Sequence, residues 1–206
     1  MGLSAEALKA SLDALAAREP AFAVALARAG YPAPRIRPRG YETLMRTIVG
    51  QQVSVAAASS VWTRLAALLE TPDDPARLLA ASDEALRAAG MSRQKSGYLR
   101  SLAALVESGA LDLHALPADD EAAIAQLTRI KGIGRWSAEI YLLFAEGRPD
   151  IWPAGDLAVQ KQVGVILGLP ERPSEQQTRD LAEPWRPHRG AAAVFAWHDY
   201  MAGAAI

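Results

Sequence analysis

The sequence predicts an all-helical protein, and three observations lead to this fold class. Half of the 206 residues are apolar, which is enough to form a substantial core. Alanine and leucine, which favour helices, dominate this apolar set, and runs of β-branched residues are scarce. Apolar residues recur at spacings of three and four, and glycine and proline lie between the periodic segments rather than inside them.

The periodic segments predict the helices in chain order. They cover residues 4–17, 20–30, 41–49 and 53–69, two short helices within 75–89, and helices that begin near residues 92, 119, 135, 157, 174 and 188. Ser82 and Ser92 are predicted N-caps, and Ser174 with Gln177 matches a capping box. Residues 31–40 contain three prolines and are predicted to be an extended segment that crosses between two lobes.

Composition excludes several classes of site and leaves others open. The chain has no cysteine, so disulfides, thiolate-bound zinc and iron–sulfur clusters are excluded. It has no apolar run of about 18 residues and no cleavable signal, so we expect a soluble intracellular protein that does not enter a membrane. The net charge of −1 neither supports nor excludes nucleic-acid binding. Basic residues do cluster locally, at Arg129, Lys131, Arg135 and Lys161, and again at Arg93, Lys95 and Arg100.

The most informative local pattern is a glycine-rich turn followed by a lone carboxylate. Two glycines in 131–134 permit positive φ and a close approach of the backbone to a ligand, and the N–H groups that begin the next helix suit a phosphate. Asp156 then stands at the start of another helix. Each feature has a purely structural alternative, a helix C-cap and an N-cap respectively. Together they indicate an enzyme that acts on nucleic acid.

Five segments form an ordered set of motifs, namely 48–54, 90–99, 127–138, Asp156 with the residues after it, and 185–197. This set resembles the helix-hairpin-helix, Gly/Pro-Asp superfamily of DNA glycosylases, and within it the 3-methyladenine DNA glycosylase II branch. The resemblance implies a two-lobed helical fold with a cleft between the lobes and without the N-terminal β domain of larger members. Residues 1–40 plus 113–206 are expected to form one lobe, and 41–112 the inserted lobe.

The resemblance also assigns roles to individual residues. It implies that Asp156 is the catalytic acid, stabilising positive charge on the sugar and orienting or deprotonating a water. Trp136 and Trp197 are the expected walls of a base pocket, with a place in the core as the alternative for each. Bifunctional relatives carry lysine at the position of Trp136, so we expect hydrolysis without strand cleavage. Ile140 stands where relatives have an aromatic residue, which leaves the shape of the pocket open.

The expected DNA contacts lie mostly in the hairpin. They are Lys131, Gly132, Ile133, Gly134 and Arg135, together with Gln51, Gln52 and Lys95. Gln51 and Gln52 stand where the branch places the wedge that fills the vacated base stack, although some relatives have leucine at the position of Gln52. The backbone carbonyls of Thr128, Ile130 and Ile133 are expected to hold a structural monovalent cation, Na⁺ or K⁺, and no cofactor is required.

The resulting hypothesis is a monofunctional glycosylase that flips and removes alkylated purines in base excision repair. The expected substrates are 3-methyladenine, with 7-methylguanine and deaminated purines as further ones. The expected partner is damaged double-stranded DNA, bound by a monomer. Two alternatives remain at this point: a glycosylase for another base, such as uracil or an oxidised base, and a non-catalytic hairpin module that only grips DNA.

Overall fold

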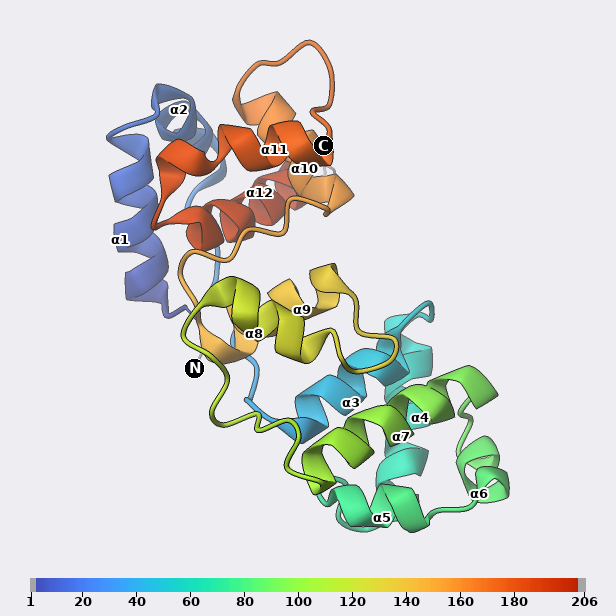
Figure 1. Ribbon diagram of the computed structural model, residues 1–206. Coiled ribbons are helices and arrows are strands. Elements are labelled where there is room, and N and C mark those ends of the chain that lie inside the picture. The colour runs from blue at the N-terminus through green and yellow to red at the C-terminus, as the bar shows by residue number, and fades with distance from the viewer. Residues whose placement is uncertain (1–2, 204–206) are drawn as a thin grey trace. The chain divides into compact units, whose positions relative to one another are not determined.

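The computed structural model describes residues 3–203, and these residues form helices and no strand (Figure 1). The α-helices are α1 Ala5–Ala16, α2 Pro20–Ala29, α3 Tyr41–Gly50, α4 Val55–Leu69, α5 Pro75–Ala80, α6 Asp83–Ala88, α7 Arg93–Glu107, α8 Asp120–Leu127, α9 Arg135–Tyr141, α10 Leu157–Ile166, α11 Glu175–Leu181 and α12 Arg189–Gly203. A π-helical turn, η1 Leu142–Glu146, follows α9, and a 3₁₀ turn, η2 Glu183–Trp185, precedes α12. The predicted all-helical class is confirmed.

The helix starts follow the predicted capping chemistry. Ser82 accepts a hydrogen bond from Ala85 N, and Ser92 accepts one from Lys95 N at 3.2 Å. Ser174 begins α11 with a complete capping box, in which its hydroxyl and the side chain of Gln177 each satisfy a backbone N–H. The helix predicted to begin near residue 135 changes at residue 142 to a π turn, which continues to Glu146.

The first of two compact units combines both ends of the chain, Met1–Arg37 and Glu139–Ile206. Within it, α12 packs against α1, α2 and α10. Its core contains edge-on aromatic pairs: Trp185 meets Phe22 and Trp152 at centroid distances of 5.0 and 5.5 Å. Phe195 of α12 is fully buried and adjoins Phe22.

The second unit, Pro38–Ala138, is built around α7. Helices α3, α5 and α6 all pack against α7, and α4 packs on α3. Leu44, Ile48, Leu65 and Leu99 are fully buried in this core. Trp62 of α4 is buried beside the guanidinium of Arg46, whose central carbon lies 4.1 Å from the ring centroid.

The boundaries of these units differ from the predicted lobes at residues 38–40 and 113–138. The sequence-based division placed the glycine hairpin with Asp156, whereas the hairpin belongs to the compact unit that contains α7. The reason is a set of contacts with the preceding helices: Lys131 N donates to Ser101 Oγ at 3.1 Å, and Gln51 Nε2 donates to Gly132 O at 2.8 Å. These contacts join distant parts of the sequence, so apolar periodicity does not reveal them.

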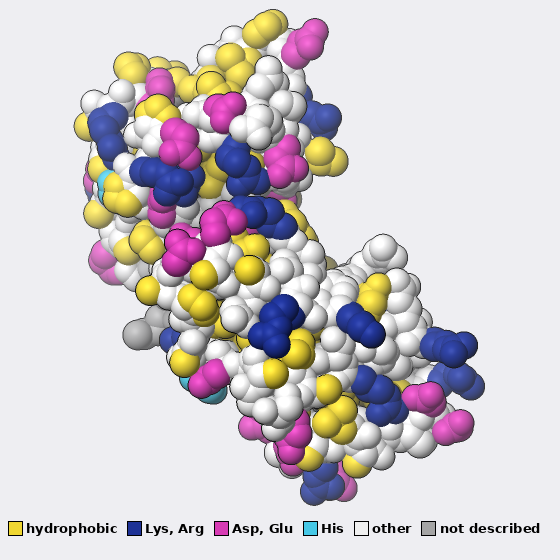
Figure 2. All heavy atoms as spheres, viewed as in Figure 1, with side chains coloured by type: hydrophobic (Ala, Val, Ile, Leu, Met, Phe, Trp, Pro, Cys, Tyr) yellow, Lys and Arg dark blue, Asp and Glu magenta, His cyan; other side chains and the backbone are white. Residues whose placement is uncertain are grey.

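The surface agrees with a nearly neutral chain. Figure 2 shows Lys and Arg side chains interspersed with Asp and Glu over the face in view, rather than gathered on one side. Among residues 3–203, no helix has the length and apolar character needed to cross a bilayer.

Candidate active site

Asp156 is fixed by the helix that it begins. It is the N-cap of α10, and its Oδ1 accepts hydrogen bonds from Ala158 N at 2.9 Å and Val159 N at 3.0 Å. Its backbone is extended, as the N-cap position requires. A carboxylate at this position is also stabilised by the dipole of the helix. The capping role is therefore confirmed, and it leaves the half-buried carboxylate in a defined place where it can act on a ligand.

Trp197 of α12 meets this carboxylate directly. Its Nε1 donates to Asp156 Oδ1 at 3.2 Å, so the indole contacts the predicted catalytic group through its polar edge. One ring face packs against Phe144 of η1, with centroids 5.7 Å apart at 36°. The half-buried Trp197 is thus part of the surroundings of Asp156, and its role as a wall of a base pocket stays a prediction.

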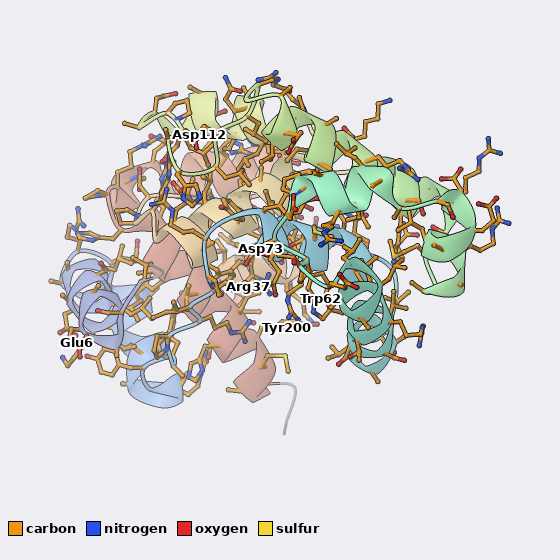
Figure 3. The ribbon with its side chains drawn as sticks, turned by 90° about the horizontal axis from the view of Figure 1, so that it is seen from below. Glu6, Arg37, Trp62, Asp73, Asp112 and Tyr200 are labelled. Atoms are coloured by element: carbon orange, nitrogen blue, oxygen red, sulfur yellow. The ribbon has the colours of Figure 1, made fainter. Side chains whose placement is uncertain are left out.

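Phe144 and Arg37 complete this cluster, and the sequence did not indicate them as site residues. Phe144 is buried, as expected for a core residue, yet it also supports the Trp197 ring. Its carbonyl accepts a hydrogen bond from Arg37 N at 2.9 Å, and the Arg37 guanidinium lies 5.9 Å from its ring centroid. Arg37 is labelled in Figure 3. Apolar periodicity indicates a buried face for Phe144, and it carries no signal for a contact with a ring 53 residues further along the chain.

This cluster can stabilise positive charge. A fixed carboxylate with two of its donors supplied by the backbone needs little reorganisation when a cation develops beside it. The neighbouring indole offers an electron-rich face, which attracts cationic ligands. A hollow of about 820 Å³ in this unit lies elsewhere, along the loop Leu167–Pro173 and Trp185, and no predicted site residue lines it.

The glycine hairpin forms the second candidate site, in the unit of residues 38–138. Gly132 has a φ of +82°, and a Cβ built on it would lie 2.2 Å from Cδ2 of Tyr98, so only glycine fits this position. The side chains of Ile130 and Ile133 are buried and anchor the turn. Ile133 N donates to Ile130 O at 3.0 Å, which closes the turn.

The hairpin leaves some backbone donors available for an anion. Within residues 3–203, the N–H groups of Gly132 and Gly134 donate no hydrogen bond. Lys131 N is used by Ser101, so a contact from Lys131 to a phosphate would come from its ammonium group. The guanidinium of Arg135 forms an ion pair with Glu121, with Nη1 2.8 Å from Oε2. The phosphate contacts themselves stay predictions.

The remaining predicted DNA contacts have structural partners of their own. Gln51 is tied to the hairpin through Gly132 O, whereas Gln52 is exposed and has a φ of +55°, which is rare for a residue other than glycine. Lys95 Nζ donates to Val49 O at 2.7 Å and so supports the end of α3, and partial burial lowers its pKa from the usual value. The assignment of Gln52 as the wedge stays a prediction.

The structure divides the two expected pocket walls between the units. Trp136 lies on α9 within residues 38–138 and is 48% exposed, whereas Trp197 belongs to the unit that contains Asp156. Trp136 is therefore a surface residue rather than a core tryptophan. The pairing of the two rings around one base stays a prediction.

The cation site also stays a prediction. The Ile130 carbonyl already accepts the hydrogen bond from Ile133 N, and a carbonyl oxygen has a second lone pair for a cation. The other two expected ligands are the backbone carbonyls of Thr128 and Ile133. All three are hard oxygen ligands, which suit Na⁺ or K⁺.

Comparison with known proteins gives a consistent result. Residues 45–187 match the model of the HhH-GPD superfamily base excision DNA repair protein. The chain is 32% identical over 161 residues to DNA-3-methyladenine glycosylase 1 of Schizosaccharomyces pombe, which covers 76% of this chain and 71% of that protein.

Two solved structures are similar over most of their length. A DNA-3-methyladenine glycosidase from Bacillus halodurans has a TM-score of 0.88 and 31% identity, over 95% of this chain and 91% of the other. The Schizosaccharomyces pombe 3-methyladenine DNA glycosylase, solved in complex with abasic DNA, has a TM-score of 0.72 and 30% identity, over 86% and 89% of the two chains. With its hairpin, its capping aspartate and these matches, the chain belongs to the HhH-GPD superfamily of base excision DNA repair proteins.

Proposed function

We propose that this protein is a monofunctional DNA glycosylase that hydrolyses the N-glycosidic bond of alkylated purines. The observation that carries the proposal is Asp156, whose Oδ1 is held by two backbone N–H groups and by the indole of Trp197, in a chain of a base excision repair family. Relatives named for 3-methyladenine support the substrate class. The proposed substrates are 3-methyladenine first, then 7-methylguanine and deaminated purines.

For the methylated purines, the proposed reaction depends on charge rather than on acid catalysis at the base. Alkylation gives the purine a positive charge, so it leaves as a neutral base when the bond from N to C1′ breaks and the electron pair goes to the base. Positive charge develops on the sugar, and the Asp156 carboxylate stabilises it. Water then adds to C1′ and loses a proton to the carboxylate or to solvent, which leaves an abasic site.

Absence of strand cleavage is part of the proposal. A lyase of this family needs an amine that forms a Schiff base with the sugar, and the matching position here is Trp136, which has none. The enzyme should therefore stop at the abasic site.

The proposed partner is damaged duplex DNA, bound by a monomer inside the cell. The amides of Gly132 and Gly134 offer two donors for a backbone phosphate, a contact that positions the protein without reading sequence. The Schizosaccharomyces pombe relative solved with abasic DNA supports this assignment. We propose no required cofactor, and a monovalent cation at the carbonyls of Thr128, Ile130 and Ile133 as a bridge to the phosphate.

The decisive experiment compares the parent with Asp156→Asn on duplex DNA treated with a methylating agent. Asparagine can keep the cap through its carbonyl oxygen, so the fold and DNA binding should persist while the charge is lost. We expect the parent to release methylpurines and the variant to be slower by about 100-fold or more. Strand breaks should appear only after alkali treatment.

Each other outcome has a definite meaning. If no damaged base is released, the enzyme assignment fails and the non-catalytic hairpin module is favoured. Release of uracil or an oxidised base in place of methylpurines favours the second alternative, and breakage without alkali contradicts the monofunctional assignment.

A further inference from the structure

Three hydrogen-bond donors converge on one oxygen of Asp156. Two come from the first turn of α10, Ala158 N and Val159 N, and the third is Nε1 of Trp197 on α12, 3.2 Å away. The backbone donors belong to the element that carries the aspartate, whereas the indole belongs to a different helix. The third donor therefore determines how the carboxylate is oriented relative to α12 and the surroundings of Trp197.

A second carboxylate keeps α12 in register with α10. Asp199 is 3% exposed, and it accepts hydrogen bonds from Gln162 Nε2 of α10 and from Arg28 Nη2 of α2, the latter at 2.9 and 2.7 Å. It follows Trp197 by two residues. The two helices are thus joined at two places, by Trp197 on Asp156 and by Asp199 on Gln162, so the indole N–H is held in place on the carboxylate.

The ring of Trp197 is supported from a third direction. Phe144 packs on it with centroids 5.7 Å apart, and Phe144 itself is held by Arg37 N on its carbonyl. The indole is therefore restrained through its ring by Phe144 and through its helix by Asp199. A donor restrained in this way aligns its acceptor at little cost in entropy.

We propose that Trp197 is a positioning residue for Asp156, acting through its indole N–H rather than only through its ring. The proposal deepens the function proposed above and rests on it. The cap places Oδ1 at the start of α10, and the Trp197 N–H restrains the same oxygen from α12. This second restraint keeps the anion aligned with the developing charge on the sugar. The N–H edge and the ring face of one side chain then have separate roles, orientation of the acid and contact with the base.

Trp197→Phe separates these two roles, because phenylalanine keeps an aromatic ring and loses the donor. We expect the single-turnover rate of methylpurine release to fall about tenfold, the effect of one hydrogen bond to a charged group. Affinity for a duplex that contains a non-hydrolysable methylpurine nucleotide should stay within about twofold, because ground-state binding does not use this bond. Trp62→Phe, the same substitution in the other compact unit, is the matched control and should keep the parent rate.

Two results of this kinetic comparison would overturn the proposal. One is a Trp197→Phe rate within about twofold of the parent, and the other is a rate loss matched by an equal loss of affinity, which would leave Trp197 as a pocket wall only. Circular dichroism melting of each variant identifies a loss caused by unfolding.

A measurement that needs no substrate tests the bond itself. The chain has five tryptophans, and the indole N–H signal that disappears from a ¹H–¹⁵N spectrum in Trp197→Phe identifies the signal of Trp197. In Asp156→Ala this signal should move strongly, because its acceptor is gone. An unchanged signal would show that the bond is not formed in solution and would overturn the proposal. If Trp197→Phe is unfolded, the contact of the Trp197 indole with the Phe144 ring assigns the signal in the parent spectrum instead. If the parent releases no methylpurine, the proposed function fails while this spectrum still decides whether Asp156 is held by Trp197.

Discussion

Gly132→Ala should strongly destabilise the hairpin unit, for two independent reasons. The residue has a φ of +82°, a conformation that costs an alanine about 1–2 kcal/mol. The new Cβ would also lie 2.2 Å from Cδ2 and 2.4 Å from Cε2 of Tyr98. Forcing these atoms apart in a packed site costs about 1–3 kcal/mol. The sum predicts a loss of about 2–5 kcal/mol in the free energy of unfolding.

Urea denaturation followed by circular dichroism measures this loss, and two further variants separate its parts. Gly134→Ala is the matched control, because a Cβ there meets nothing within 4 Å. It should change stability by less than about 0.5 kcal/mol. In a Tyr98→Ala background the steric part disappears, and Gly132→Ala should then cost only the backbone part of about 1–2 kcal/mol. A Gly132→Ala variant as stable as the parent would refute the reasoning, and so would a cost that is unchanged when Tyr98 is removed.

Two other predictions concern a cap and a histidine. Asp156→Ala should lower the free energy of unfolding by about 1 kcal/mol compared with Asp156→Asn, because alanine cannot accept the hydrogen bonds from Ala158 N and Val159 N. Equal melting temperatures for the two variants would contradict the capping role. Burial and the charge of Arg18 lower the pKa of His188 below its ordinary value of 6.5, so the unfolded state binds more protons and stability should fall as pH drops below that value. Urea titrations across this range should show a weaker fall in His188→Gln, and an identical pH dependence in both proteins would exclude this contribution.

Much of the fold follows from local sequence information. Serine and aspartate caps, helical spacing and the proline-rich segment 31–40 are signals carried by a few adjacent residues, and the helices begin close to where these signals place them. The turn at Gly132 was predictable for the same reason, because glycine readily adopts the positive φ that this turn requires. The ordered motifs likewise led to the correct family.

Tertiary structure decided which of these segments meet. Trp197 and Asp156 are 41 residues apart, and Gln51 and Gly132 are 81 apart, so their contacts depend on how whole helices pack rather than on any local pattern. For this reason local patterns did not indicate the contact of Gln51 with Gly132 or the contact of Phe144 with Trp197. The sequence alone determined the helices, the glycine turn and the capping aspartate. Packing determined which neighbours orient that aspartate, because apolar periodicity identifies a buried face but not the face that covers it.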